Sequence, residues 1–475
     1  MKVLIISVNR NRLPTLVLPA GACMAAEAAS DSGHETRLID FMFERSPALR
    51  LEPELKDFQP DVVGISVRNI DNNDIQSPVL FAEELLPAMK IIRERSSAVV
   101  VLGGPAISIM PEVFLNYTNA DFAIAGNADP AFSRLLEKLA GKETPQNIPG
   151  VHERGKSGKG KGMDRTGPSP YSFRFPDFRA WVDWREYRSS MVSIPLKTKT
   201  GCEFQCVYCT YDTIDGGGRV LCDPAIVVEA VGKYSRHGFK NFEFVDNVFN
   251  SPYSHAMDVC EGIARSGIRA GFECMDVNPL HFDGALLGAM ERAGFKGIGI
   301  TIESASDPVL QGFKKGFASV HARKAAETIR RGRIPCMWFF MMGGPGETRE
   351  TVEETLSFAR ERIRPGDPAY FTIGIRIYPG TALELLARDQ GILAENAGGL
   401  LRPAFYVSPE LDKAWLARRM KEEASRRMNF LIAGESGFAP SPWVLSLGRT
   451  LRMKPPLWRH IRPLRMGMRL LRIGG

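Results

Sequence analysis

A chain of 475 residues exceeds what one hydrophobic core usually organises, so we expect two or three domains. Apolar residues make up 44% of the chain and charged residues 24%, which excludes a mostly disordered protein and a polytopic membrane protein. The net charge of +7 is concentrated at one end, because residues 449–475 carry +8 and the rest of the chain −1. Such a balanced body gives no electrostatic reason to expect a nucleic-acid partner.

No membrane span or secretory signal is expected. The longest apolar stretch, residues 13–26, is interrupted by two prolines, a threonine and a glycine. Residues 1–8 alternate like a first strand, and no cleavable apolar core follows a basic start. We therefore expect a cytoplasmic protein.

Residues 1–140 predict a doubly wound, Rossmann-like α/β domain. Short β-rich runs alternate with helical stretches such as residues 20–30 and 81–95. The expected strands are residues 2–8, 35–40, 61–67, 98–102 and 122–125. Strands separated by helices form a parallel sheet, and such a sheet binds ligands at the carboxyl ends of its strands.

Residues 141–189 are expected to form a linker. Their composition shifts to Gly, Lys, Ser and Pro, and the run 155–162 contains no apolar residue. The lysines of this run lack the spacing of a phosphate-binding loop.

Residues 190–390 predict a second βα series. The expected strands are residues 192–196, 242–245, 270–274, 297–302, 336–341 and 370–377. The helices between them are residues 224–237, 253–266, 283–293, 320–331 and 349–360. This repetition indicates a partial (β/α)6 TIM-type barrel, whose functional groups lie at the strand carboxyl ends. After Gly391 the strand pattern stops, so we expect residues 391–475 to be a helical region with a basic tail.

Three of the eight cysteines lie in one short loop, at the spacing C-x3-C-x2-C. Cys202, Cys206 and Cys209 follow an expected strand, whereas the other five are scattered. Three thiolates on one loop can bind three irons of a [4Fe–4S] cluster and leave the fourth iron open to a small ligand. A structural zinc site is the alternative, but it needs four ligands, and no nearby Cys or His completes a familiar pair.

This loop, with Tyr208 just before its third cysteine, resembles that of the radical S-adenosylmethionine (SAM) enzymes. Further segments are similar to successive strand ends of the branch of that family that carries an N-terminal cobalamin-binding domain. They are FEFVDNVFN at 242–250, GITIESASD at 299–307, MMGGPGET at 341–348 and YPGT at 378–381, with VVGISV at 62–67 and VVVLGGP at 99–105 in the N-terminal domain. The resemblance covers most of the chain up to about residue 385.

The resemblance implies that the three cysteines hold the cluster and that SAM chelates its open iron. Cleavage of SAM requires an electron to pass from the cluster into the sulfonium, so SAM must lie close to the iron and away from water. Tyr208 is expected to lie against the adenine, and Glu303 to contact the ribose or methionine end. A glutamate at a strand end can also simply face solvent or cap a helix.

Three further residues are expected at SAM. Asp246 and Asn247 stand where many radical SAM proteins have a GGE-type turn for the SAM amino group, and we expect them to replace it. Arg376 lies on an apolar strand, where an unpaired charge is costly, so we expect a carboxylate partner, from SAM, the substrate or the barrel. The turn at 343–348 is explained by structure alone, as the capped start of a helix.

The N-terminal domain lacks one motif. Many cobalamin proteins place a histidine on cobalt with Asp-x-His-x-x-Gly, which does not occur here, and His34 has the wrong spacing from Asp31. We therefore expect cobalt to lack a histidine ligand, as in the radical SAM branch. The residues expected near cobalamin are Asn9, Ser66, Arg68, Asn69, Gly103, Gly104, Gly126 and Asn127. The two adjacent glycines can equally form only a strand-to-helix turn.

The resemblance implies a cobalamin-dependent radical SAM methyltransferase that acts on an unactivated carbon. In the family's scheme one SAM methylates cobalt, a second yields a 5′-deoxyadenosyl radical that abstracts hydrogen, and the substrate radical takes the methyl group. The same cofactors can support cyclisation, ring contraction or carbon–carbon coupling, and a non-catalytic cobalamin or iron–sulfur sensor is a further alternative. A flavodoxin or ferredoxin is the expected electron donor.

The basic tail predicts an amphipathic segment. Its two faces are Arg459, Arg462, Arg465, Arg469 and Arg472, and Leu457, Ile461, Leu464, Met468 and Leu471. Such a helix can lie on an anionic inner-membrane surface, which would favour a lipid or isoprenoid-derived small-molecule substrate. Pro463 argues against a continuous helix, and the alternative is a segment docked on the barrel with a solvated Arg face.

Overall fold

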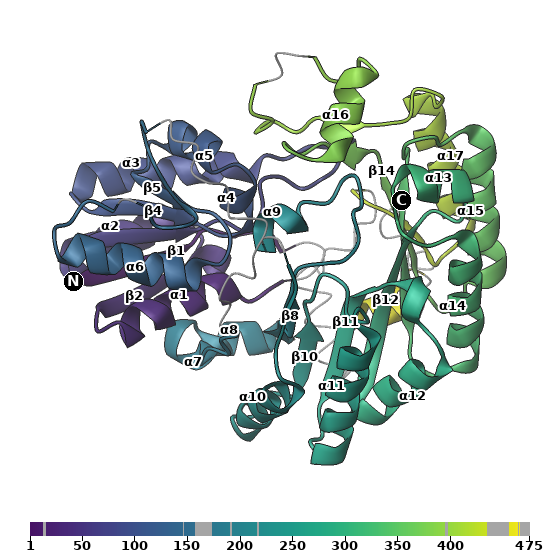
Figure 1. Ribbon diagram of the computed structural model, residues 1–475, viewed down its shortest axis with the longest axis horizontal. Coiled ribbons are helices and arrows are strands. Elements are labelled where there is room, and N and C mark those ends of the chain that lie inside the picture. Colours follow the sequence, from purple (N-terminus) through teal and green to yellow (C-terminus); the bar gives the residue numbers. More distant parts are fainter. Residues whose placement is uncertain are drawn as a thin grey trace.

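Two parallel sheets with their helices make up the molecule (Figure 1). The computed structural model describes residues 1–12, 16–145, 147–156, 173–190, 192–215, 218–394, 398–434, 456–463 and 465. The N-terminal domain, in purple and blue, lies beside the barrel, in teal and green, and the short helix α9 (Tyr211–Asp215) lies between them. Helix α9 contacts α4 (Pro105–Ile109) of the N-terminal domain, so the loop that precedes α9 is close to both domains.

The N-terminal sheet has six strands in the order β2-β1-β3-β4-β5-β6. They are β1 (Lys2–Ser7), β2 (Glu35–Asp40), β3 (Val62–Ser66), β4 (Val99–Gly103), β5 (Phe122–Ile124) and β6 (Val151–Glu153). The first five run parallel. The inner strands β1, β3, β4 and β5 are largely buried, because helices cover both faces of the sheet, whereas the edge strand β2 is mostly half-buried. Helices α1 (Ala20–Asp31) and α6 (Ala128–Ala140) pack on one face, and α2 (Pro47–Phe58), α3 (Leu85–Arg95) and α5 (Pro111–Thr118) on the other.

The predicted linker is partly structured. Strand β6 pairs antiparallel with β5 and closes one edge of the N-terminal sheet. Helices α7 (Phe178–Trp181) and α8 (Trp184–Ser189) follow, and the Tyr187 hydroxyl donates a hydrogen bond to Asp40 at the end of β2. The prediction of a linker over 141–189 is therefore wrong at these elements, and most of the run 155–162 lies outside the described residues.

The second sheet is a partial barrel of seven parallel strands in the order β17-β14-β13-β12-β11-β10-β7. They are β7 (Ile194–Leu196), β10 (Asn241–Phe244), β11 (Gly271–Val277), β12 (Phe295–Glu303), β13 (Cys336–Met342), β14 (Ala369–Ile373) and β17 (Phe430–Ile432). The covering helices are α10 (Pro224–Arg236), α11 (Tyr253–Ser266), α12 (Gly284–Ala293), α14 (Ser319–Arg331) and α15 (Arg349–Arg362). The first six strands in chain order, β7 to β14, correspond to the six strands predicted from the sequence.

The prediction that strands end at Gly391 is wrong. Strand β16 (Phe405–Tyr406) pairs with β15 (Ile375–Arg376), and β17 extends the barrel sheet beside β14, while α16 (Ala382–Asp389) and α17 (Lys413–Arg426) are the helices of this region. These strands of two and three residues are too short to show an alternating pattern in the sequence.

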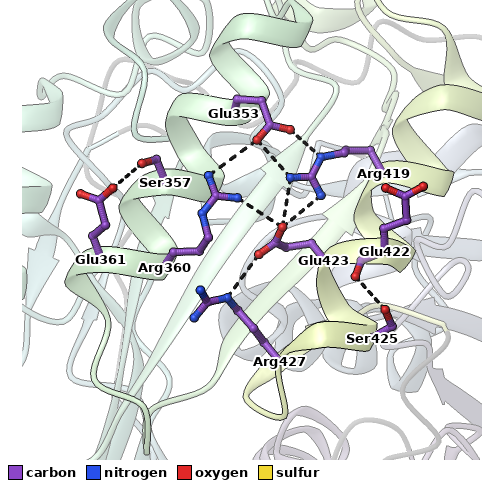
Figure 2. A network of polar contacts seen from close by, with 9 residues as sticks. All are labelled: Glu353, Ser357, Arg360, Glu361, Arg419, Glu422, Glu423, Ser425 and Arg427. Carbon is purple, nitrogen blue, oxygen red and sulfur yellow. Dashed lines mark hydrogen bonds and ion pairs between the residues drawn. The ribbon is translucent and has the colours of Figure 1, made fainter.

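Helix α17 is fixed to the barrel helix α15 by a buried ionic network (Figure 2). The Glu423 carboxylate, only 4% exposed, accepts from Arg360, Arg419 and Arg427, and Glu353 pairs with Arg360 and Arg419. Each carboxylate of this network is shared between arginines around the buried Glu423, and the network holds α17 so that β17 can pair with β14.

The C-terminal segment packs into the barrel. Residues 457–460 form a short 3-10 helix, from which Trp458 and Ile461 are buried against Met337 and Leu431. The Arg465 guanidinium donates to the carbonyl oxygens of residues 428 and 430. Residues 456–463 and 465 are therefore docked on the barrel, but Arg465 bonds backbone carbonyls and is not part of a solvated Arg face. The membrane-facing assignment of Ile461 is wrong because the barrel already covers it.

Residues 466–473 of the predicted amphipathic segment, and Leu464, lie outside the described residues. In the described ranges, no helix has the length and apolar character needed to cross a membrane.

Candidate active site

The cysteine loop lies within the connection between two short antiparallel strands that follow the first barrel strand. Strand β8 (Lys199–Thr200) pairs with β9 (Val220–Leu221), and Gly201 then turns the chain with φ +74°. A Cβ atom on Gly201 would lie 2.1 Å from the carbonyl oxygen of Gly218, so only glycine fits before Cys202.

Backbone contacts hold the loop in place. The amide of Val207 donates to the carbonyl of Phe313 (3.1 Å), and the amide of Leu383 donates to the carbonyl of Val207 (2.8 Å). The loop is thereby tied to α16 and to the segment after α13 (Asp307–Gly312), which both lie at the strand carboxyl ends.

The three thiols fit an iron–sulfur cluster. Burial raises the pKa of all three, and burial together with the neighbouring Cys206 and Cys202 raises the pKa of Cys209 to about 12. Thiols in this environment bind as thiolates only when a cation compensates their charge. In a cluster each thiolate binds a different iron. Across the described ranges, no three His, Cys, Asp or Glu side chains are close enough to share a single metal ion.

Beside the loop, Tyr208, Glu303 and Lys315 form a buried triad. The Tyr208 hydroxyl donates to Oε1 of Glu303 (2.8 Å), and Nζ of Lys315 lies 2.9 Å from Oε2 of Glu303 and 3.2 Å from the Tyr208 oxygen. Glu303 ends β12 in the left-handed region, at φ +59°, a strained conformation for a non-glycine residue that is typical of functional sites. The structure therefore brings Tyr208 and Glu303 together, with a lysine that the sequence analysis missed.

Lys315 remains charged in this site. Burial alone would lower its pKa, but the Glu303 carboxylate and the Cys206 thiol outweigh burial and raise the pKa above its usual value. A buried ammonium beside the cysteine loop can bind an anionic group such as the SAM carboxylate. No periodic signal in the sequence marks Lys315, because its partner Glu303 is reached only through the turn after α13.

Asp246 has a role besides the predicted contact with SAM. Its two oxygens accept from the amide and hydroxyl of Thr198 (2.6 and 2.7 Å) and from the amide of Lys199. Because Thr198 and Lys199 lead into the cysteine loop, Asp246 holds the start of that loop, and its contact with SAM stays a prediction.

Asn247 is engaged in a similar way. Its Nδ2 donates to Asp215 of α9 (2.7 Å), whose other oxygen pairs with Lys197 (2.7 Å). Asn247 therefore links the end of β10 to α9 and to the strand end that carries Lys197.

Arg376 lies at the interface between the two domains. Its Nε donates to Oδ2 of Asp71 (2.8 Å), and its other nitrogens donate to the carbonyls of Ile377, Leu400 and Leu401. The predicted carboxylate partner exists, and it is Asp71 of the N-terminal domain. The SAM contact of Arg376 stays a prediction, although its guanidinium is already bonded to Asp71 and to backbone carbonyls. Nearby, the Tyr378 hydroxyl donates to Asn73 (2.7 Å) and extends the same interface.

A cavity of about 270 Å³ lies at the carboxyl ends of β1, β3, β4 and β5. Five of the eight residues predicted near cobalamin line it: Ser66, Gly103, Gly104, Gly126 and Asn127. Asn9, Arg68 and Asn69 are not among the described residues that line it. The Asn9 side chain instead accepts a hydrogen bond from the Asn11 amide.

The two adjacent glycines, Gly103 and Gly104, have different structural roles. A Cβ atom on Gly104 would lie 2.5 Å from the carbonyl oxygen of Val67, and its φ of +103° suits glycine, so the strand-to-helix turn explains it. A Cβ atom on Gly103 would meet nothing within 4 Å, which leaves open space that a ligand can approach. Of these two glycines, Gly103 is therefore the better candidate for a backbone contact with a ligand in the cavity.

Other lining residues were missed by the sequence analysis. Phe173 and Arg174 follow the undescribed part of the predicted linker, and Arg174 pairs with Asp31 (2.5 Å) and Asp129. Helix α1 contributes Met24. These residues do not lie at strand ends. The sequence analysis considered only strand ends, because ligands of a parallel sheet bind there, and it therefore missed them.

Two family models match the chain. Residues 6–136 match the B12 binding domain, and residues 196–359 match the radical SAM superfamily. The protein is a radical SAM enzyme with an N-terminal B12-binding domain. The predicted fold class is confirmed, as are the cofactors named for these two domains, a [4Fe–4S] cluster, SAM and cobalamin.

Curated relatives of this radical SAM enzyme share a low identity over most of its length. It is 26% identical over 376 residues to an uncharacterised methyltransferase of Pyrococcus horikoshii, which covers 77% of each chain. It is 22% identical to the tryptophan 2-C-methyltransferase of Streptomyces laurentii, over 82% of this chain and 77% of that one.

Solved structures show the same fold. The radical SAM methyltransferase TsrM of Kitasatospora setae, with tryptophan and a SAM analogue bound, superposes with a TM-score of 0.85 at 20% identity and 99% coverage of both chains. The cobalamin-dependent radical SAM enzyme OxsB superposes with a TM-score of 0.67 at 16% identity, over 89% of this chain and 66% of that one.

Proposed function

We propose that this enzyme is a cobalamin-dependent methyltransferase that transfers a methyl group to an unactivated carbon of a small molecule. The shared cavity carries the proposal. Its walls come from the N-terminal strand ends and also from Pro195, Lys197, Asp215 and Val245 of the barrel. Asp215 also accepts a hydrogen bond from the amide of Gly201, the residue before Cys202, so the cavity lies next to the start of the cysteine loop. Groups held by the two domains would therefore lie on opposite sides of one space.

The residues of this chain supply binding and orientation. Cys202, Cys206 and Cys209 would hold the cluster, which supplies the electron that SAM cleavage requires. Bound cobalamin supplies a cobalt atom that can carry a methyl group. Glu303 and Lys315, both buried, would hold the charged end of SAM without bulk water.

The names of the relatives support methyl transfer. Two curated relatives and the TsrM neighbour are named methyltransferases, whereas another relative, from Cereibacter sphaeroides, is a magnesium-protoporphyrin IX monomethyl ester cyclase at 24% identity. Cyclisation with the same cofactors is therefore the second candidate. A lipid-like substrate, contact of the tail with an anionic membrane, and a flavodoxin or ferredoxin donor remain predictions from the sequence.

The test uses anaerobically reconstituted protein with cobalamin, SAM and a strong reductant. Methyl transfer predicts both S-adenosylhomocysteine and 5′-deoxyadenosine among the products, with the former dependent on added cobalamin. Formation of 5′-deoxyadenosine alone would favour the second candidate. Formation of neither product would refute the proposal.

Cysteine variants supply the matched control. Cys202→Ala, Cys206→Ala and Cys209→Ala should each lose iron and both products, whereas Cys260→Ala, at a buried position on α11, should retain them. Cleavage of SAM at the native rate by a triple Cys→Ala variant would contradict the assignment of the cluster.

A further inference from the structure

Two glutamates lie side by side on the interior face of the barrel. In β10, Phe242 and Phe244 are buried under the covering helices, so Glu243 between them points to the opposite face. The parallel register places Glu243 directly beside Glu273 of β11. Neighbouring strands therefore present two carboxylates to the same interior space.

Among the described residues, no ion pair is formed with either of these two glutamates. The Ser193 hydroxyl donates to Oε1 of Glu273 (2.6 Å), but the Glu243 side chain makes no hydrogen bond or ion pair with any residue that the structure describes. Burial raises the pKa of Glu243, and the guanidinium of Arg68 only partly opposes this. Burial and the neighbouring Glu243 raise the pKa of Glu273 to about 8. Two adjacent, weakly solvated carboxyl groups hold their protons near neutral pH, and a positive group bound between them would favour their charged forms.

Trp458 forms the floor below the two glutamates. The position next to Glu273 in the sheet is Gly297, where a Cβ atom would lie 2.5 Å from the indole ring, so the ring occupies the space a side chain would fill. Trp458 is 6% exposed, and its Nε1 has no hydrogen-bond partner among the described residues, although it is close enough to Glu273 to lower the pKa of that residue. The buried indole N–H beside Glu273 can therefore also donate to a polar ligand bound there.

The other side of this space is apolar. Phe339 of β13 and Tyr370 of β14 are neighbours in register, with ring centroids 5.9 Å apart in an edge-to-face arrangement. Both pack against the cluster formed by Met337, Leu431, Trp458 and Ile461. Their rings are partly exposed on the face of the sheet that carries the glutamates. Aromatic rings opposite carboxylates form a setting in which an ammonium group is bound by charge and by ring faces together.

We propose that this floor is the substrate subsite and that it takes a primary amine with an aromatic or apolar body. The ammonium group would lie between Glu243 and Glu273, the body would pack on Phe339 and Tyr370, and an oxygen near the amine would accept from the Trp458 indole. This rests on the proposed function and names its substrate class. The strand supports the placement, because Val245, two residues after Glu243 on the same face, lines the cavity shared by the two domains.

The test measures binding to the holoenzyme by anaerobic titration calorimetry. The probes are 2-amino-3-phenylpropan-1-ol and 3-phenylpropan-1-ol, which differ only in the amine. We expect the amine to bind at least about tenfold more tightly than the alcohol, because only the amine supplies the missing cation. Equal binding of the two probes, or no binding of the amine at millimolar concentration, would overturn the proposal.

Variants locate the site. Glu243→Gln and Glu273→Gln should each weaken binding of the amine probe by at least about fivefold and leave the affinity for the alcohol probe unchanged. Glu261→Gln, at an exposed ion pair on α11, should change neither. Iron and cobalamin content report folding of each variant, and unchanged amine affinity in both folded variants would refute the assignment.

The SAM products are measured on the same holoenzyme preparation. If both products form while the amine fails to bind, the subsite is wrong and the methyltransferase proposal stands. If neither product forms, the proposed function itself fails.

Discussion

The ion pair between Asp71 and Arg376 should control how the two domains are held together. We expect Arg376→Met to lower the free energy of unfolding by about 3–5 kcal/mol, because the variant leaves the Asp71 carboxylate buried without its partner. The side chains of this pair are 0% and 3% exposed, so solvent screening does not reduce the effect. The loss of hydrogen bonds to the carbonyls of Ile377 and Leu400 adds to it.

A double-variant cycle isolates the pair. Asp71→Asn with Arg376→Met should be more stable than the sum of the single effects predicts, by at least about 1.5 kcal/mol, because no buried charge remains. Arg265→Met provides the matched control, since its pair with Glu261 is exposed and should contribute less than about 1 kcal/mol.

Urea unfolding gives the free energies, and hydrogen exchange locates the effect. In Arg376→Met, amides of residues 70–75 and 400–406 should exchange faster, while the centre of the N-terminal sheet should not change. Cobalamin should still bind, but S-adenosylhomocysteine formation should fall, because the two halves of the shared cavity separate. An Arg376→Met protein within about 1 kcal/mol of the native enzyme would refute this reasoning.

Three further predictions concern single sites. Lys315→Met should retain iron but raise the KM for SAM by at least about tenfold, since Glu303 would then repel the SAM carboxylate; an unchanged KM would exclude the contact. The pKa of Glu347, raised from 4.5 to about 7 by burial, means that its stabilising contribution is full below pH 4.5 and is lost as the pH rises through 7. Relative to Glu347→Gln, the native enzyme should therefore lose about 2–3 kcal/mol of unfolding free energy between pH 5 and 8, and parallel stability curves would contradict this. The Co(II) spectrum should lack imidazole coupling, since no histidine is among the described residues that line the cavity, and a coupling lost in His34→Ala would contradict it.

The sequence by itself determined the cofactor chemistry and most of the fold. The cysteine spacing is local, so Cys202, Cys206 and Cys209 are recognisable without any tertiary contact. Strands such as β1, β3, β4 and β13 are buried apolar runs, and their pattern predicts them directly. The sequence also located the cavity at Gly103 and Gly126, because a parallel sheet binds ligands at its strand ends.

Tertiary structure decided which charged groups meet. Arg376 and Asp71 are 305 residues apart, and nothing near either residue in the sequence identifies the partner. Strand β17 has three residues and exists because β14 pairs with it and the network around Glu423 holds α17. Trp458 reaches Gly297 only when the C-terminal segment enters the barrel. Such contacts depend on the closure of long loops, whose partners are chosen by packing and charge in the folded state and leave no periodic pattern in the chain.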